Sequence, residues 1–421
     1  MHLLRVALFL SLTTATTLHA ENWPQWRGAK FDGISTEKNL PSTWSKTENV
    51  AWKATLPGPG GSTPSIWDKH IFLTCVDGKD LVLIGIDTSG KELWKKVIGS
   101  GNQNVRGDEG NYASPSTSTD GKNVWAFVGN GVMACYDFAG KEIWKLDLQE
   151  RYGKFNIQFG LSSTPVLDGD KLYMQLIHSG GAHVIAFDKN TGKEVWHTKR
   201  PSDATDECEQ SYASPTLYRD GKLEYLLTHG ADYIIAHNLT DGKELWRCGG
   251  LNPHGGRYNK TLRFVASPLA VPGLIVVPSA KNGPVMGLKP DSKGDISTDA
   301  FQHAWTMPQN TPDVPSPLVY DGFVYLCREN GNLICLDAKT GEKYYDNRTH
   351  ADRHRASPIY ADGKILITAR DGTITVVKPG KEFSVIASNK LDEHMTASPA
   401  ISDGTIYLRT FESLYAIRAA K

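Results

Sequence analysis

Apolar runs and tight turns alternate along most of this chain, in units of about fifty residues. In one such unit, apolar runs at 124–128 and 132–136 lie between turns that contain glycine, and Glu142-Ile143-Trp144 begins a further run. Asp-Gly and Asn-Gly pairs recur in the turns, and they tolerate the positive φ that two-residue hairpin turns require. Each unit therefore predicts four short antiparallel strands.

A Ser-Pro or Thr-Pro step opens every unit. The eight steps have their prolines at Pro64, Pro115, Pro165, Pro215, Pro268, Pro317, Pro358 and Pro399. Spacings of 41 to 53 residues lie in the range of propeller or solenoid repeats. Proline has no amide hydrogen to donate, so it belongs at the first residue of a strand or on a sheet edge. We expect each step to begin an innermost strand, where a small side chain suits the crowding near an axis.

A second signature marks the fourth strand of each unit: an acidic or amide residue, a Gly-Lys turn and then an aromatic residue. Regular copies end at Trp94, Trp144, Trp196 and Trp246. Later copies are less regular and end at Trp305, Tyr345 and Phe383. A large aromatic side chain here can bury roughly 200 Å². We interpret the tryptophans as packing anchors between neighbouring blades.

The two ends of the repeat region complement each other. The eighth unit stops after Leu414-Tyr415-Ala416-Ile417 and lacks a fourth strand, while residues 49–54, around Trp52, carry that pattern without a unit of their own. Pairing the two removes both exposed strand edges. We therefore expect an all-β protein, an eight-bladed β-propeller of four-stranded antiparallel blades, closed by an N-terminal strand that completes the last blade.

This interpretation divides the chain into three parts. Residues 1–20 have a weakly basic start, an apolar run and small residues before Glu21, which is typical of a signal peptide. Residues 21–48 form an N-terminal arm, and the propeller covers 49–421 with its closing strand at 49–56. We expect the arm to pack on the side or base of the ring; a tail that binds a partner is the alternative.

Charge and hydropathy narrow the range of partners. Lys plus Arg and Asp plus Glu both number 46, so the chain lacks the positive field that nucleic acids select. No segment after the first twenty residues reaches eighteen uninterrupted apolar positions, so we expect no membrane span. Together with the signal peptide, this predicts a periplasmic or secreted protein, which we expect to be a monomer.

Six cysteines are spread over the chain. Four of them, Cys75, Cys135, Cys327 and Cys335, lie in apolar runs, where cysteine usually acts as a small buried side chain. Cys208 and Cys248 lie in loops one repeat apart and could form a disulfide or stay separate. No Cys-x-x-Cys pair occurs, so the chain has no zinc ribbon and no covalent haem attachment site.

The Ser/Thr-Pro steps and the Asp-x-x-Thr-Gly-Lys-x-x-Trp motif resemble the pyrroloquinoline quinone (PQQ)-type repeat family over residues 49–421. The segments 23–28, 59–64 and 293–297 resemble an exported bacterial branch described as PQQ-like. The resemblance implies a β-propeller. The resemblance does not indicate whether the protein is an enzyme, because the same repeat also builds non-enzymatic outer-membrane assembly scaffolds.

The sequence can also be checked for the cofactor-binding residues of the enzymes in that family. Quinoprotein dehydrogenases carry two adjacent cysteines over the quinone and a set of carboxylate and amide ligands for calcium. This chain has no adjacent cysteine pair, and no spacing singles out a calcium site, so no metal site is assigned. PQQ with calcium is therefore an alternative cofactor set and not the expected one.

A ligand site is expected at one mouth of the axial channel, on the loops that precede the inner strands. Residues in these loops that could bind a small polar ligand or an anion are Arg106, Glu109, Tyr112, Glu209, Tyr212, Arg263, His354 and His394. Tyr112 and Tyr212 precede their Ser-Pro steps by the same spacing, so we expect them at equivalent places. The alternative is that these are solvated loop residues and repeated structural hydrogen bonds.

The chain lacks the nucleophile elbow G-x-S-x-G and the zinc helix H-E-x-x-H. The leading hypothesis is an exported, non-catalytic propeller that binds a protein, a polysaccharide or a small polar ligand through its channel-mouth loops. The alternative is a divergent PQQ-dependent oxidoreductase that acts on an alcohol or sugar, and catalytic residues are unassigned in either case.

Overall fold

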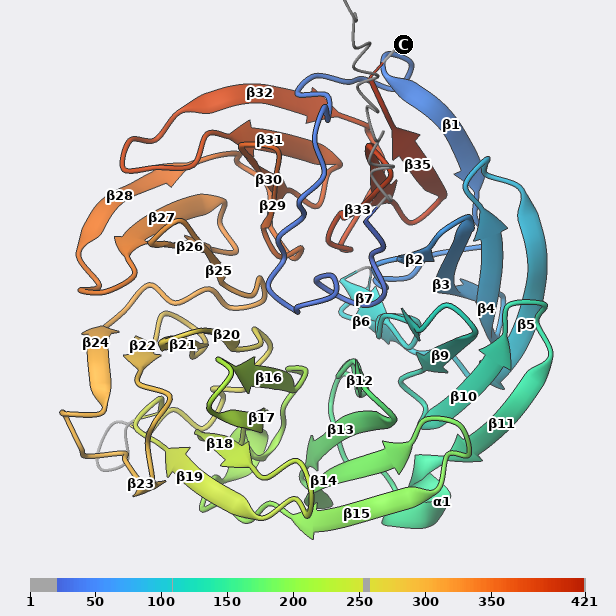
Figure 1. The fold of residues 1–421 in the computed structure, drawn as a ribbon. Coiled ribbons are helices and arrows are strands. Elements are labelled where there is room, and N and C mark those ends of the chain that lie inside the picture. Colours follow the sequence, from blue (N-terminus) through green and yellow to red (C-terminus); the bar gives the residue numbers. More distant parts are fainter. Residues whose placement is uncertain (1–20, 108, 253–257, 420–421) are drawn as a thin grey trace, which may run out of the picture.

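The computed structural model describes residues 21–107, 109–252 and 258–419, so the predicted signal peptide lies outside the described residues. Eight sheets surround a central axis (Figure 1), and the prediction of an eight-bladed propeller is confirmed.

The first four blades contain the following strands, each blade given from its inner to its outer strand: β2 (Ser65–Trp67), β3 (His70–Asp77), β4 (Asp80–Asp87), β5 (Glu92–Ser100); β8 (Ser118–Thr119), β9 (Asn123–Phe127), β10 (Val132–Asp137), β11 (Glu142–Asp147); β12 (Val166–Asp168), β13 (Lys171–His178), β14 (Gly181–Asp188), β15 (Glu194–Lys199); β16 (Thr216–Arg219), β17 (Glu224–Gly230), β18 (Tyr233–His237), β19 (Glu244–Cys248).

The other four blades follow the same order. They are β20 (Leu269–Val271), β21 (Leu274–Pro278), β22 (Val285–Leu288), β24 (His303–Met307); β25 (Leu318–Tyr320), β26 (Phe323–Cys327), β27 (Asn332–Asp337), β28 (Lys343–Arg348); β29 (Ile359–Ala361), β30 (Lys364–Thr368), β31 (Thr373–Val377), β32 (Val385–Lys390); β33 (Ala400–Ser402), β34 (Thr405–Arg409), β35 (Ser413–Ile417), β1 (Val50–Thr55).

The remaining elements lie outside this pattern. They are the hairpin strands β6 (Asn104–Val105) and β7 (Gly110–Asn111), the helix α1 (Leu148–Tyr152), the 3₁₀ turn η1 (Asp206–Glu209) and β23 (Gly294–Asp295). β23 belongs to an insertion in the fifth blade and pairs in parallel with β19 of the fourth. Among the described helices, none has the length and apolar character needed to cross a membrane.

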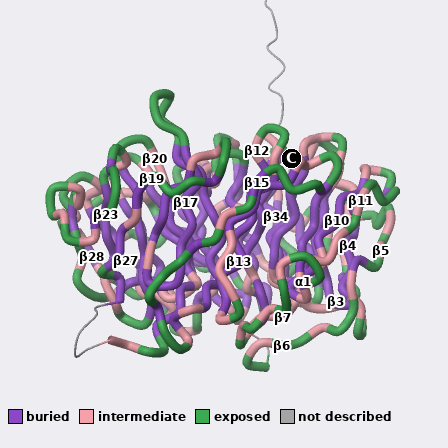
Figure 2. Tube along the Cα trace, turned by 90° about the horizontal axis from the view of Figure 1, so that it is seen from below, coloured by how far each residue is buried: buried purple, intermediate pink, exposed green. Residues whose placement is uncertain are grey.

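Burial explains why the two middle strands of a blade are continuously apolar. In β3 and β4 the six central residues are buried, whereas exposed and half-buried positions alternate along β1, the outer strand of the last blade. Figure 2 shows this as buried segments inside the ring and exposed loops at its two ends. The middle strands are covered on both faces by neighbouring blades, while outer strands face solvent on one side.

A ring of hydrogen bonds joins the blades near the axis. In seven junctions, the backbone N–H of one entry residue donates to the side-chain oxygen of the next, at 2.9–3.0 Å. The members, here called the hydroxyl ring, are Thr63, Ser116, Thr164, Ser214, Ser267, Ser316, Ser357 and Ser398. At the eighth junction the Thr63 hydroxyl donates to the carbonyl of Ser398 at 3.3 Å. The recurring hydroxyl is therefore a hydrogen-bond acceptor as well as a small residue.

The tryptophans of the outer strands make a second set of junctions at the rim. In five of them the indole Nε1 donates to a backbone carbonyl in a turn of the next blade, at 2.8–3.0 Å: Trp52 to Thr88, Trp94 to Phe138, Trp144 to Lys189, Trp196 to Leu239 and Trp305 to Ala338. Trp246 is buried, and its ring meets Tyr225 edge-on.

Each of those five rings lies on the glycine of the neighbouring turn. At Gly242, φ is +74° and a Cβ would come within 2.5 Å of the Trp196 ring, so both the turn and the close contact require glycine. Gly90 also has a positive φ, and a Cβ there would lie 2.8 Å from the Trp52 ring. The Gly-Lys turn and the aromatic residue of the repeat thus belong to one contact between successive blades.

The last blade is closed as predicted. β1 pairs with β35 in an antiparallel register that sets Trp52 opposite Ala416 and Thr55 opposite Ser413. A buried apolar cluster continues across this closure from the seventh blade to the first, and includes Ile359, Ile401 and Ile66. The contact of Trp52 with Gly90 makes the eighth-to-first junction resemble the others.

The N-terminal arm crosses one end of the channel. Trp23 and Ile66 exchange backbone hydrogen bonds at 3.0 and 2.7 Å, and Gly33 and Ser35 bond with Tyr360 on the seventh blade. Between them, the fully buried Arg27 donates to the carbonyl of Pro317 at 2.6 Å, and burial lowers its pKa to about 10. In Figure 1 this blue segment passes over the centre of the ring.

Cys208 and Cys248 are free thiols in this structure, so the disulfide is not formed. Cys208 Sγ lies 3.0 Å from the carbonyl of Asn259, and Cys248 Sγ lies 3.4 Å from that of Gly249. All six cysteines are buried.

The hydroxyl ring can be tested at one junction. Ser357→Ala removes the acceptor for the buried N–H of Ser316, which should lower the free energy of unfolding by about 1–3 kcal/mol. Ser357→Thr keeps the accepting hydroxyl, as Thr164 does naturally at another junction, and should stay close to the wild type. Urea denaturation of the three proteins measures this, and equal losses in both variants would contradict the acceptor role.

The closure can be tested by removing its strand. Deleting residues 45–56 removes β1 and leaves β35 as an unpaired edge, so we expect strong destabilisation or aggregation. Thermal unfolding and size-exclusion chromatography report the two outcomes. An unchanged melting curve would show that β1 does not hold the ring together.

Candidate functional site

Two connected cavities form a funnel on the axis. The outer one, here called the mouth cavity, has a volume of about 180 Å³, and the inner one has about 120 Å³. Eight residues line both: Gly61, Ser114, Ser162, Tyr212, Val265, Val314, Arg355 and Thr396. Each stands two positions before a member of the hydroxyl ring. The ring therefore sets these eight residues at one level, where the channel opens.

The funnel is open on one side of the molecule. Trp26 of the arm lines the inner cavity together with the hydroxyl ring. Its neighbours on the arm bond to the far ends of the inner strands, as when Thr119 donates to the carbonyl of Pro24 at 2.8 Å. The hairpin β6–β7 lies at the opposite end (Figure 2) and lines the mouth cavity. A ligand would therefore enter from the hairpin side.

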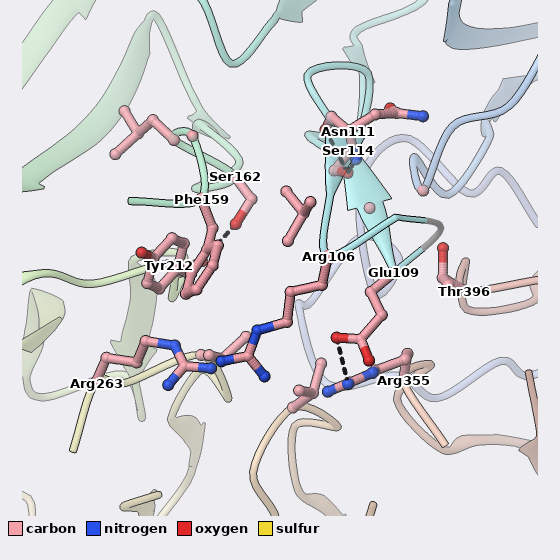
Figure 3. Close-up of a pocket in the computed structure, with 17 residues that line it drawn as sticks. Arg106, Glu109, Asn111, Ser114, Phe159, Ser162, Tyr212, Arg263, Arg355 and Thr396 are labelled. Carbon is pink, nitrogen blue, oxygen red and sulfur yellow. Dashed lines mark hydrogen bonds and ion pairs between the residues drawn. The ribbon is translucent and has the colours of Figure 1, made fainter. Parts of the chain in front are cut away.

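Two arginines share one aromatic ring in the mouth cavity. The guanidinium of Arg106 lies 4.8 Å from the centre of the Phe159 ring, and that of Arg263 lies 5.1 Å from it. Tyr212 packs against the same ring at 6.0 Å. Figure 3 shows the two guanidinium groups directed toward each other. The negative face of an aromatic ring holds cations without neutralising them, so positive charge gathers here.

Glu109 joins the hairpin to the opposite side of the mouth. Its carboxylate forms ion pairs with Arg353 and, at 2.7 Å, with Arg355, both from the loop between the sixth and seventh blades. Arg355 also reaches Glu329 at 3.1 Å. The hairpin is thus fastened across the funnel by a carboxylate held between two guanidinium groups, as the dashed line to Arg355 in Figure 3 indicates.

Several donors at the mouth are buried but incompletely satisfied. Arg355 Nε and Thr396 Oγ1 have no hydrogen-bond partner among the described residues. The Arg263 side chain is 9% exposed and pairs with Glu207 at 3.0 Å. Burial together with the charge of Arg263 lowers the pKa of nearby Lys281, and Arg106 adds to this. Such donors favour an acceptor that carries negative charge.

Four of the predicted site residues meet in the mouth cavity: Arg106, Glu109, Tyr212 and Arg263. Tyr112 does not hold the place equivalent to Tyr212. It packs instead against Gly129 and Gly160, where a Cβ would lie 2.7 and 2.4 Å from its ring. The reason is a shift of two residues: the second blade contributes Ser116 to the hydroxyl ring and not Ser114, so Ser114 takes the position of Tyr212.

The other three predicted residues lie outside this cavity. Glu209 ends η1 and lines a separate pocket with His178 and Arg200. His354 is completely buried, its Nδ1 lies 2.9 Å from the Asp352 carbonyl, and burial lowers its pKa to about 4. The ring of the exposed His394 stacks on Phe411.

Sequence reasoning missed Arg355 and Phe159. Arg355 stands two residues before Ser357, in the position that lines the channel in every blade, so this offset would have identified it. Phe159 lies in the loop after α1, outside the repeated motifs, and no local signal marks it.

The mouth cavity does not fit the calcium site that the resemblance to the dehydrogenases implies. Calcium requires several oxygen ligands, most of them carboxylates. Glu109 is the one carboxylate that lines this cavity in the described chain, and Arg353 and Arg355 already bind it. No group of three His, Cys, Asp or Glu side chains is placed to hold a metal within the described ranges. The donors present are mainly guanidinium groups and hydroxyls.

Comparison with known proteins identifies the same family that the repeat motif of the sequence resembles. The family model described as outer membrane protein assembly factor BamB matches residues 88–347 and 281–421. The outer membrane protein assembly factor BamB of Yersinia pestis is 25% identical over 302 residues, which cover 68% of this chain and 70% of that protein.

Solved structures show the same fold at low identity. A europium-containing methanol dehydrogenase superposes with a TM-score of 0.70 at 13% identity, covering 93% of this chain and 90% of that one. BamB from Moraxella catarrhalis superposes with a TM-score of 0.61, also at 13% identity, and the superposition covers 87% of this chain and 99% of that one. Both a dehydrogenase and an assembly factor are therefore built on this ring, so the fold alone does not decide between them.

The buried histidines predict a pH dependence of stability. Burial lowers the pKa of His178, His237 and His354 from 6.5 to about 4. Between these values the unfolded chain binds more protons than the folded one, so stability should fall as pH falls from 6.5 to 4. For His354 alone the loss is on the order of 3 kcal/mol. Urea unfolding across this range measures it, and His354→Asn should flatten the curve; equal slopes would contradict the assignment.

Proposed function

The chain belongs to the PQQ-like β-propeller family whose model is described as outer membrane protein assembly factor BamB, and we propose that it is an exported, non-catalytic scaffold. It binds its partner through the loops around the channel mouth. The observation that best supports this proposal is the funnel, which is open at one end only. The arm closes it at Trp26, and arginines, hydroxyls and aromatic rings line its open end.

The chemistry of these loops is that of recognition. Arginine and tyrosine are enriched in the parts of interfaces that carry most of the binding energy. Arg353 of the mouth loops is about half exposed, and it lines a neighbouring pocket with Arg328 and Arg348. A partner that covers the mouth would therefore meet several guanidinium groups held by a rigid ring.

The relatives support a protein as the partner. Both curated relatives that match are named outer membrane protein assembly factors. A polysaccharide or a small polar ligand is the other class that the same groups could bind. The predicted signal peptide and the naming of the relatives support a periplasmic or secreted location.

The oxidoreductase alternative rests on the fold shared with the dehydrogenases. It is weakened by the donor set of the mouth cavity, in which the described residues supply one carboxylate, Glu109, where calcium needs several oxygen ligands. Dye reduction with an alcohol or sugar, dependent on added PQQ and calcium, would establish the alternative and overturn the scaffold proposal.

Photo-crosslinking tests the face that binds. A photoreactive residue at the exposed Asn330, beside the mouth, should form a specific crosslink to a partner in the native cell envelope. The control is the same residue at the exposed Asp68, on the turn after the first inner strand, which should give none. Crosslinks from Asp68 alone, or from neither position, would contradict binding through the mouth.

A further inference from the structure

The mouth cavity contains an arrangement of charges that specifies a ligand more narrowly than a general binding surface does. Among the residues that the structure describes, three guanidinium groups line it, from Arg106, Arg263 and Arg355, and one carboxylate, that of Glu109. Glu207 lies outside the lining and neutralises part of Arg263. Among the described residues, no carboxylate forms an ion pair with Arg106. Within the described part of the chain, the excess of positive charge is therefore on the Arg106 side of the cavity.

The protein itself shows how this cavity binds a carboxylate. Glu109 reaches in from the hairpin, and its two oxygens are divided between Arg353 and Arg355. Arg106 and Arg263 form a second pair of guanidinium groups on the other side, directed toward each other beside Phe159 (Figure 3). A planar guanidinium presents parallel N–H donors that match the two oxygens of a carboxylate.

The rest of the lining sets the size and polarity of the ligand. A volume of about 180 Å³ is below the 300–1,000 Å³ of drug-sized pockets, so a single ring or a short chain fits. Val105, Val265 and Val314 provide an apolar wall. At the next two blade entries, Arg355 Nε and Thr396 Oγ1 are buried groups without a partner among the described residues. The ligand should thus combine a carboxylate with a compact body that offers one further acceptor.

We propose that the mouth cavity binds a small organic acid, with its carboxylate between Arg106 and Arg263 and its body against the valine wall. This inference rests on the proposed function, since it specifies the ligand class of the same mouth. Two sources share the required chemistry: an acidic sugar residue and a simple ring carboxylic acid. The ion pairs of Glu109 stay intact when the ligand enters, because they lie on the other side of the cavity.

Calorimetric titration of the full-length mature protein tests this with matched probes. D-galacturonate is compared with neutral D-galactose, and benzoate with benzyl alcohol, at low ionic strength. We expect at least one acid to bind saturably and about tenfold or more tightly than its neutral counterpart, because a charge-assisted hydrogen bond is lost in the latter. Binding of galacturonate alone identifies an acidic sugar as the source, and binding of benzoate alone identifies a ring acid.

Arg106→Met is the decisive variant because Arg106 is exposed, so its loss should leave the fold intact. It should weaken acid binding by about tenfold or more. Arg106→Lys should recover only part of the affinity, since lysine keeps the charge and loses the planar pair of donors. Arg151→Met, on α1 and outside the cavity, is the matched control and should bind as the wild type does.

The outcomes separate this inference from the proposed function. No preference for either acid over its neutral counterpart, or an acid affinity unchanged in Arg106→Met, overturns the inference. Crosslinking from Asn330 is independent of it, because that readout requires no small ligand. Loss of both results would overturn the mouth as a binding site altogether.

Discussion

The hydrogen bond between one blade's amide and the next blade's hydroxyl is the constraint on which both ring and site depend. It fixes the height at which each inner strand enters, and the same offset of two residues then places eight residues at the channel opening. Such a bond is buried, so its absence would leave an amide without a partner. The repeated Ser/Thr-Pro step therefore builds the frame and positions Tyr212, Arg355 and the other residues that give the mouth its chemistry.

The rim contact complements the axial one. Five outer-strand tryptophans lie on the turn glycine of the next blade and donate to a neighbouring carbonyl, so five of the blade junctions in the described chain are fixed at two radii. Trp52 extends the contact across the closure, where the chain has no covalent continuity. Between the two contacts the middle strands are buried on both faces, which accounts for the unbroken apolar runs of the sequence.

The repeat made the architecture predictable, whereas the site depended on details that local patterns hide. The number of blades, their strand order and the pairing of residues 49–54 with 414–417 all follow from turns and hydrophobic periodicity. Tyr112 was misplaced because Ser114-Pro115 looks like the other steps, while Ser116 actually joins the hydroxyl ring. His354 was expected at the mouth but is enclosed by the fold. Phe159 could not be predicted, because cation–π contacts between separate loops exist only once the ring has formed.

The closing pair also determines the order in which the molecule can be completed. β1 is synthesised before every other strand of the propeller, yet its partner β35 is the last to leave the ribosome. Until then the β1 edge has no neighbour within its own chain, and contacts so distant in sequence form slowly. A second nascent chain could supply the missing edge in the meantime, which would give an exchanged dimer. If the chain is exported unfolded, this competition takes place after it has crossed the membrane. There, β1 of the same chain and β1 of a second chain would compete to pair with β35.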